Sequence, residues 1–401
     1  MSGVEEFRLR SIAWLDSVAA TFGSEARHEL SPSGDLALGR RYMAAKYEAG
    51  FSGINWPVEF GGQGLSPLHK ITFDTEEMRY RMPTGYFSVS IGMPVPVLIR
   101  FGQDREWVKQ RVIRALRGEE IWCQLFSEPA AGSDLAGLRT RAEPDGNGWK
   151  LNGQKLWTSW AQYSDFGVIV ARTDISAFKH KGLTYYWVDM KAPGVQVRPI
   201  KLAGGDSHVN EVFFDDVKLT DAQRISPVGG GFAVAMATLM IERYAATDSA
   251  GSGPHLDLFI ELARQLQING KPALQDGRVR SAISRNYAMR RGLDAITARA
   301  MKMMEAGMEP GPEGALNKLF SVRSRQRLSE LAIDLQGNTA FAFDPHSFVK
   351  EDWTASWLNA PTGRIAGGAD EMLLNTIAER ILGLPQDYRP DKGVPFNEIP
   401  A

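Results

Sequence analysis

The chain has 401 residues, of which 43% are hydrophobic and 23% charged, and these values are ordinary for a globular protein. Its formal net charge of −1 creates no overall field that would attract nucleic acid or an anionic membrane. The single cysteine, Cys123, excludes an internal disulfide and any metal site built from several cysteines.

The N-terminal residues mix acidic and basic side chains with apolar ones at helical spacing, so they do not form a signal peptide. No apolar run reaches the roughly 18 residues that a membrane helix needs. Together with the cysteine content, which fits a reducing compartment, this predicts a cytoplasmic protein. We expect neither a membrane nor a nucleic acid as its partner.

Residues 1–120 are predicted to be helical. Apolar side chains recur at spacings of three and four residues in segments 4–21, 35–50, 85–101 and 105–117. Loop signals interrupt the pattern at Asn55-Trp56-Pro57 and at Gly61-Gly62-Gln63-Gly64.

Residues 121–226 are predicted to form a β domain, and helical periodicity returns from residue 227 to the end. The runs rich in Val, Ile and aromatic residues are 166–171, 183–190, 195–200 and 209–214. Asn152-Gly153 separates two further short runs and is a strong hairpin signal. The later helical segments lie near 231–266, 278–308, 314–339 and 369–383.

Small residues and hydroxyls follow a strand-like start in the segment 122–136. In Ser127-Glu128-Pro129-Ala130-Ala131-Gly132-Ser133-Asp134 such residues let backbone amides approach a flat or anionic ligand closely. The alternative is a tight surface turn capped by Ser133 or Asp134, which composition alone favours.

Trp157, Thr158 and Ser159 follow the predicted hairpin. A tryptophan offers a large flat face, and the neighbouring hydroxyls can hydrogen-bond a heterocycle. Taken singly, the motif is better explained by a tryptophan that fills the core of the β domain.

Glu242 shares a predicted helix face with Ala235, Leu239 and Ala246. A carboxylate on such a face is costly unless it is paired or functional. Desolvation would raise its pKa toward neutrality, which suits a general base. An ion pair between Glu242 and Arg243 at a helix–helix interface is an equal alternative.

Gly367 and Gly368 precede a predicted helix whose first turn contains Asp370 and Glu371. The free amides and the dipole of a helix N-terminus suit a phosphate. Asp370 could instead cap this helix, and acids in the first turn would weaken anion binding, so this signal is ambiguous by itself.

Motifs of several other classes are absent. The sequence contains no G-x-G-x-x-G, P-loop, G-x-S-x-G or H-E-x-x-H motif. The six histidines show no ligand spacing, so no metal site is expected. The basic residues form no strip interleaved with aromatic residues, which argues against nucleic-acid binding.

Taken together and in this order, the motifs resemble the acyl-CoA dehydrogenase family over nearly the whole chain. The matching segments are NWPVEFGGQG at 55–64, SEPAAGSD at 127–134, WTS at 157–159, NEVFFDDV at 210–217 and IAERILGLP at 377–385. The resemblance implies an α+β fold with an N-terminal helical domain (1–120), a middle β-barrel-like domain (121–226) and a C-terminal four-helix bundle (227–401). It also implies FAD as the cofactor and an acyl-CoA thioester as the substrate.

The resemblance further implies roles at the flavin ring. Gln124 and Phe126 would line the ring, and Ser127 would contact its pyrimidine edge. Trp157 would pack against the isoalloxazine with Thr158 beside it, and Ser159 would hydrogen-bond near N5, the hydride acceptor.

Other matching residues would bind the remaining parts of the ligands. Ser133 would lie near the pantetheine of coenzyme A or the flavin, and Arg243 would face the coenzyme A part of the thioester. Gly368, Asp370 and Glu371 would lie by the dinucleotide end of FAD. The chain departs from the family at Ala369, where a threonine is common, and it lacks the usual Arg-x-x-Phe-Gly segment around 264–266.

The resemblance also bears on the catalytic base. Many members carry the base as a glutamate at the position that Gly367 occupies here, whereas others carry it where Glu242 stands. The sequence therefore predicts Glu242 as the base. A helix with Glu-Arg, here at 242–243, and an Ile-Ala-Gly-Gly segment, here at 365–368, occur together in a bacterial branch of the family. Some members of that branch act on bulky acyl groups such as steroid side chains.

The family implies an electron-transfer flavoprotein, or a similar acceptor, as the redox partner and a homotetramer as the assembly, with a heterotetramer as the alternative. Two other functions compete with a dehydrogenase. One is a non-catalytic structural subunit, and the other is a flavin oxidase that uses O2.

Overall fold

The computed structural model describes residues 3–27, 29–249, 253–305, 308, 311–342 and 352–399; the side chains of 241–249, 253–255, 301, 304 and 305 also fall outside the description. The chain divides into two compact units. The first contains residues 1–200, 207–242 and 388–401, and the second contains 201–206 and 243–387. The predicted domain boundaries near residues 120 and 226 stay a prediction.

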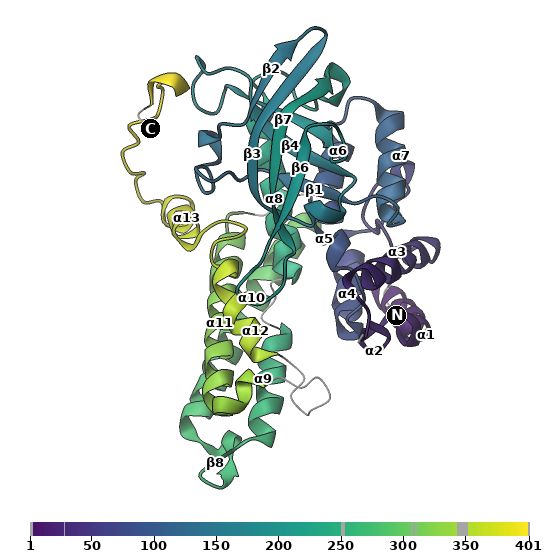
Figure 1. The fold of residues 1–401 in the computed structure, drawn as a ribbon. Helices are drawn as coiled ribbons and strands as arrows, with labels where there is room; N and C mark the ends of the chain where they lie inside the picture. The colour runs from purple at the N-terminus through teal and green to yellow at the C-terminus, as the bar shows by residue number, and fades with distance from the viewer. Residues whose placement is uncertain are drawn as a thin grey trace. The chain divides into compact units, whose positions relative to one another are not determined.

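The first unit begins with a helical layer (Figure 1). Its helices are α1 (Gly3–Phe22), α2 (Ser24–Arg27), α3 (Pro32–Glu48), α4 (Pro67–Glu77), α5 (Gly85–Gly92), α6 (Pro94–Phe101) and α7 (Arg105–Leu116). The single helix expected over 85–101 is interrupted at Met93, because a proline follows it and disfavours the helical conformation of the preceding residue. Asp104 caps α7 by accepting a hydrogen bond from the amide of Trp107 at 3.0 Å.

A seven-stranded mixed sheet follows, with strand order β1-β4-β2-β3-β7-β6 and with β5 paired to β4. The strands are β1 (Trp122–Leu125), β2 (Arg141–Asp145), β3 (Gly148–Ser159), β4 (Phe166–Arg172), β5 (Leu183–Asp189), β6 (Val195–Ile200) and β7 (Val209–Thr220). β1 runs parallel to β4, whereas β3 and β7 form a long antiparallel pair.

The hairpin predicted at Asn152-Gly153 is wrong. Both residues lie inside β3, and the turn between β2 and β3 is at residues 146–147. Gly153 has φ 148° and lies at a shift of register between β3 and β7. A β-bulge therefore uses the glycine, because a bulge needs backbone conformations that other residues disfavour.

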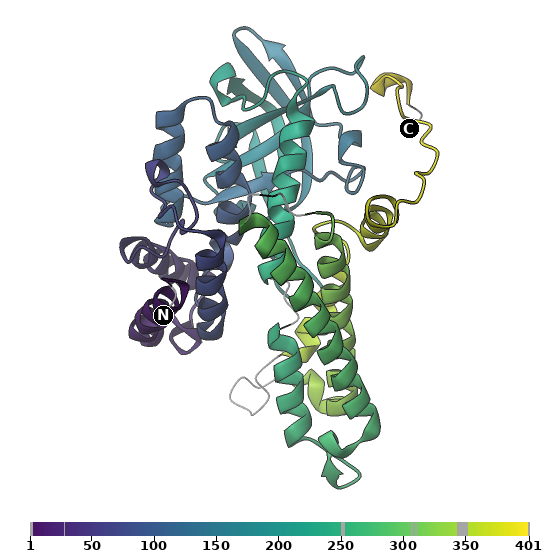
Figure 2. The ribbon, with the colours of Figure 1, turned by 180° about the vertical axis from the view of Figure 1, so that it is seen from behind.

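Helix α8 (Gly231–Ser249) packs its first half against the sheet, as Figure 2 shows. Val234 and Ala235 belong to the same buried cluster as Val168 and Tyr185. The Tyr185 hydroxyl lies 3.1 Å from the Thr238 hydroxyl. Packing and this hydrogen bond together fix the helix on the sheet.

The second unit is a bundle of helices. They are α9 (Gly253–Gln265), α10 (Gly277–Glu305), α11 (Gly314–Gln336), α12 (Trp353–Gly363) and α13 (Asp370–Thr376), which continues as a π-helical turn at Ile377–Ile381. A small hairpin of β8 (Gln267–Ile268) and β9 (Lys271–Pro272) joins α9 to α10. Phe259, Leu328 and Trp353 lie in the bundle core. None of the described helices combines the length and the apolar character that crossing a membrane requires.

Gly231 allows α8 to start directly against β5. A Cβ atom built on Gly231 would lie 2.5 Å from the carbonyl carbon of Thr184, too close for any side chain. We expect Gly231→Ala to lower the free energy of unfolding by about 1–3 kcal/mol, because the backbone must shift. Gly277→Ala is the matched control: Gly277 is also the first residue of a helix, and a Cβ atom built there would meet nothing within 4 Å. Thermal unfolding checks both variants, and equal melting temperatures would contradict the predicted close contact.

Candidate active site

The loop after β1 is fixed by a buried carboxylate. Glu128 is 8% exposed. Its Oε2 accepts a hydrogen bond from the amide of Arg139 at 2.6 Å, and its Oε1 accepts one from the amide of Thr140 at 3.0 Å. The carboxylate therefore joins the start of the segment 127–134 to residues 139 and 140, and Ser133 lies exposed between them.

The partner of this carboxylate is Lys155, whose exposure is 0%. Its Nζ donates to Oε1 of Glu128 at 2.8 Å and to the carbonyl of Phe126 at 3.0 Å. Burial lowers the pKa of Lys155, and the charge of Glu128 offsets this only in part. Burial raises the pKa of Glu128, but the charge and hydrogen bond of Lys155 outweigh it, so that this pKa lies below its ordinary value.

The end of β3 is joined to the same loop by a backbone hydrogen bond. The amide of Leu156 donates to the carbonyl of Ser127 at 2.8 Å, so the loop and the strand are joined a second time. The pairing of β3 with β7 shifts register between Lys155 and Thr158. At this bulge Trp157 adopts a left-handed conformation, φ 61°, and its side chain is 54% exposed. The tryptophan therefore does not fill the core of the β domain.

Thr158 is buried next to the exposed tryptophan, and its hydroxyl finds no hydrogen-bond partner among the described residues. Its carbonyl accepts a hydrogen bond from Nδ2 of Asn210 at 2.9 Å. Ser159 is half-buried at the end of the strand. Buried hydroxyls without a hydrogen-bond partner are unusual in folded proteins, and a contact of the Thr158 hydroxyl with a ligand stays a prediction.

The structure thus brings several predicted site residues to one place. Ser127 and Trp157 meet through the hydrogen bond of the adjacent Leu156, and Thr158 and Ser159 follow directly. Gln124 is half-buried in β1, whereas Phe126 is buried with its ring 5.9 Å from that of Tyr185. Sequence reasoning missed Glu128, Lys155 and Asn210 as supports of the site. Lys155 has the same strand parity as the buried Leu151, which is the signal that could have revealed its burial.

Glu242 and Arg243 lie in α8, one turn after Thr238. Their side chains fall outside the described residues, so that their roles stay predictions.

The remaining predicted residues lie in the second unit. Asp370 is buried, and its Oδ2 accepts hydrogen bonds from Arg323 at 3.0 Å and from Arg364 at 2.7 Å. Burial raises its pKa, but these guanidinium groups outweigh burial and hold the pKa below its ordinary value. Gly368 accepts a hydrogen bond from Lys318 at 2.6 Å, and Glu371 is exposed. Asp370 and Gly368 therefore form an ordered turn, and their contact with FAD stays a prediction.

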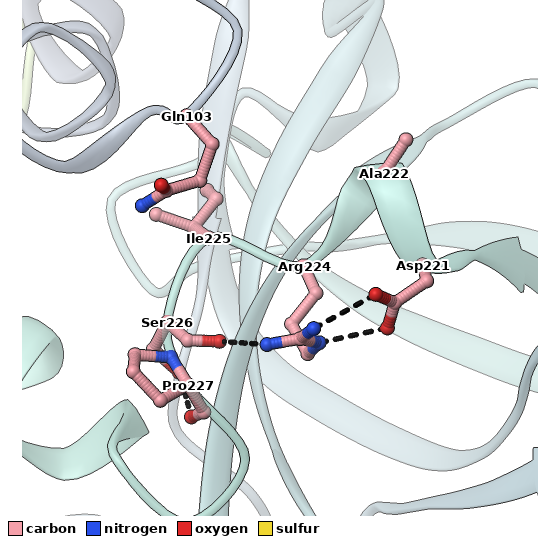
Figure 3. A pocket seen from close by; sticks show the side chains of 7 residues that line it. All are labelled: Gln103, Asp221, Ala222, Arg224, Ile225, Ser226 and Pro227. Carbon is pink, nitrogen blue, oxygen red and sulfur yellow. Dashed lines mark hydrogen bonds and ion pairs between the residues drawn. The ribbon is translucent and has the colours of Figure 1, made fainter.

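A shallow hollow in the first unit contains none of the predicted site residues (Figure 3). Its lining comes from Gln103, from residues 221–222 and from residues 224–227, and an ion pair of Arg224 with Asp221 at 2.7 Å lies in it. The hollow has no exposed aromatic face, so it does not compete with the Trp157 site.

An exposed tryptophan at a bulge of β3 offers a flat face to an aromatic ring, as expected of a flavin-dependent oxidoreductase. Family models of this class match the chain in order: the acyl-CoA dehydrogenase N-terminal domain at residues 19–120, the middle domain at 123–217 and the C-terminal domain at 229–382. The chain belongs to the acyl-CoA dehydrogenase family and is an acyl-CoA dehydrogenase, an oxidoreductase with the predicted fold. FAD is the cofactor of this fold.

Named relatives cover almost the whole chain. The acyl-CoA dehydrogenase IpdE1 of Mycobacterium tuberculosis (strain ATCC 25618 / H37Rv) is 36% identical over 402 residues, which are 97% of this chain and 100% of that protein. The ChsE4-ChsE5 complex from Mycobacterium tuberculosis contains a chain with a TM-score of 0.82 and 25% identity, covering 96% of this chain and 99% of that one. A glutaryl-CoA dehydrogenase from Mycobacterium smegmatis in complex with FADH2 shares the fold, with a TM-score of 0.75 and 20% identity, covering 97% and 96% of the two chains.

Removing one member of the buried Lys155–Glu128 pair should lower the free energy of unfolding more than removing both. Lys155→Met leaves the Glu128 carboxylate buried without its cation, so we expect a loss of about 3–5 kcal/mol in the free energy of unfolding. The double variant Lys155→Met/Glu128→Gln should recover part of this loss. Lys150→Met is the matched control, because Lys150 lies on the same strand with a partly exposed ion pair at 3.6 Å and should change stability by about 1 kcal/mol or less. Urea unfolding measures all three; a double variant no more stable than Lys155→Met would contradict the coupling.

The same pair predicts a dependence of stability on pH. The pKa of Glu128 is lower in the folded chain than its ordinary value of 4.5. The unfolded chain therefore binds more protons in this window, and the stabilisation present above about pH 4.5 is lost as the pH falls. The double variant should lose less stability than the wild type between about pH 5 and pH 3. If the free energies of unfolding of the two proteins fell equally between these pH values, Glu128 would not titrate in this way.

Proposed function

We propose that the enzyme removes two hydrogens from the α and β carbons of a coenzyme A thioester and forms the trans-2-enoyl thioester, with Glu242 as the base. The observation that carries the proposal is the bulge at Trp157, which presents an exposed ring beside the unpaired Thr158 hydroxyl. Such a pair of groups suits a flat, hydrogen-bonding heterocycle. Ser127, held next to Leu156, supplies further polar groups at the same place.

The reaction needs a base and an electron acceptor. The thioester carbonyl acidifies the α C–H bond, and hydrogen bonds to that carbonyl stabilise the developing enolate. Glu242 takes the α proton, and a carboxylate whose pKa is raised by its surroundings suits that step. FAD, when bound, supplies the acceptor for the β hydride. Trp157 and Ser159 orient the ring, and Arg243 faces the coenzyme A part of the thioester.

The backbone at residue 367 supports Glu242 as the base. Gly367 has φ 66° and Gly368 has φ 99°, conformations that glycine adopts at little cost. A glutamate at 367 would require a strained backbone here. The turn is also held by Lys318 and by the ion pairs of Asp370. A base at 367 would therefore need a different turn.

The small side chains at 367–369 also support a bulky acyl group, because they leave room where larger residues stand in other members. We propose this substrate class together with an electron-transfer flavoprotein, or a similar protein, as the acceptor. A homotetramer is the proposed assembly, and a heterotetramer is the alternative. Exposed apolar side chains of the second unit, among them Trp357, Ile365 and Leu382, are suited to contacts between subunits.

Trp157 should matter for the cofactor but little for folding. Because its side chain is 54% exposed, Trp157→Ala should change the free energy of unfolding of the FAD-free protein by about 1 kcal/mol or less. The FAD affinity of Trp157→Ala should fall about tenfold, since stacking on the flavin ring is lost. The affinity of Trp157→Phe should lie between those of the wild type and Trp157→Ala. Val58→Ala is the control, since Val58 is 71% exposed. Flavin fluorescence titration gives the affinities, and an unchanged affinity in Trp157→Ala would refute the stacking role.

The base assignment is tested by anaerobic bleaching of the flavin absorbance with a panel of straight-chain, branched and steroid-derived acyl-CoA thioesters. The wild type should be bleached by one thioester class, and Glu242→Gln should bleach at least about a hundredfold more slowly while it retains FAD. Glu371→Gln is the matched control, because Glu371 is exposed on α13.

Each other outcome has a definite meaning. Wild-type bleaching that survives in Glu242→Gln would refute the base. A chain that cannot be loaded with FAD would support the structural subunit instead. Peroxide released during turnover in air would support the oxidase.

A further inference from the structure

The C-terminal segment 388–399 returns to the first unit after the bundle helices. It is the yellow end of the ribbon in Figure 1. Pro395 forms an antiparallel bridge with Phe178. The amides of Phe396 and Asn397 donate to the carbonyls of Ala177 and Ile175, each at 3.0 Å. The segment therefore adds a short strand-like edge to the loop that follows β4.

One lysine connects this segment to the loop that contains Ser133, the residue predicted to lie near the pantetheine of coenzyme A or the flavin. Lys179 lies 2.7 Å from Oδ2 of Asp391 and 2.6 Å from Oδ2 of Asp134, the residue after Ser133. Its side chain is only 15% exposed. Burial lowers the pKa of Lys179, but the two carboxylates outweigh burial and raise it. The ammonium group thus bridges two acids that are far apart in the sequence.

Arg172 makes a second connection. It is buried, and its guanidinium donates to the carbonyl of Ala136 at 2.6 Å, of Leu138 at 3.2 Å and of Lys179 at 3.0 Å. The same guanidinium lies 3.5 Å from the ring centre of Phe396, a cation–π contact. Burial lowers the pKa of Arg172 to about 10. The loop carbonyls and the C-terminal ring therefore meet at one cation.

These two connections act on the same stretch of chain. Residues 134–138 follow Ser133 directly, and they are held on one side by Glu128 through Arg139 and Thr140. On the other side, their contacts run to Lys179 and Arg172, which the C-terminal segment covers. The loop is therefore held from both sides, and segment 388–399 supplies the contacts on the second side.

We infer that segment 388–399 is a strap that positions the loop at 133–138 for the coenzyme A part of the substrate, with Lys179 and Asp391 as positioning residues. The inference rests on the proposed function and on the role that the resemblance implies for Ser133, near the pantetheine of coenzyme A or the flavin. The strap acts on the affinity for the ligand rather than on the redox step. Lys179 and Asp391 touch no reacting atom, so they influence the reaction only through the loop.

The test uses the FAD-loaded full chain and two measurements. Hydrogen–deuterium exchange of the amides at 132–138 reports the order of the loop, and calorimetric titration with free coenzyme A reports the affinity. In Asp391→Asn and Lys179→Met, exchange in this loop should rise, and coenzyme A should bind about three- to fivefold more weakly, since the first change removes one ion pair of Lys179 and the second removes both. Lys179→Arg keeps the charge and should restore both values toward those of the wild type. Asp387→Asn is the matched control, because Asp387 is an exposed carboxylate just before the strap.

The outcomes separate the strap from the proposed function. Unchanged exchange in both variants would overturn the strap. Faster exchange without weaker coenzyme A binding would overturn its role in positioning the ligand loop. A wild type that binds no coenzyme A would instead refute the proposed function, while the exchange data would still decide whether the segment orders the loop. For the variants that bind coenzyme A, kcat at saturating thioester should stay near the wild-type value, whereas KM should rise.

Discussion

The candidate site depends on one buried ion pair. Lys155 and Glu128 are both withdrawn from water, and they hold together the loop after β1 and the end of β3. Desolvation of both charges is costly, and it is offset only because the lysine also reaches a carbonyl and the carboxylate receives two backbone amides. The pair thus favours one arrangement of loop and strand over others. Ser127 and Trp157 owe their proximity to it.

The same site contains a strained tryptophan. A left-handed conformation at a residue other than glycine costs on the order of 1–3 kcal/mol, and Trp157 adopts it with its ring exposed. The neighbouring hydrogen bonds of Leu156 to Ser127 and of Asn210 to Thr158 offset that cost. Strain of this kind persists where the surroundings impose it, which fits a surface prepared for a cofactor.

The sequence predicted the family and the fold because motifs far apart in the chain occur in one order, and this is a strong constraint. Local geometry was harder to predict. Asn152-Gly153 has the chemistry of a hairpin turn, but the pairing of β3 with β7 extends past it and converts the glycine into a bulge. The burial of Lys155 was not predicted, because a lysine is almost never fully buried unless it is paired, and its partner lies 27 residues away. The roles of the individual site residues stay predictions, since they concern ligand atoms.

The close approach of Gly231 to Thr184 fixes the position at which α8 begins. Glu242 lies eleven residues further along the same helix, a distance of roughly 16 Å at the usual rise per residue. A tilt of the helix axis by about 5° at Gly231 would therefore displace the backbone at 242 by roughly 1.4 Å. Displacements of that size are large compared with the tolerance of a proton transfer. The position of the proposed base thus depends on the start of the helix at Gly231 and on the contacts of Val234, Ala235 and Thr238 with the sheet.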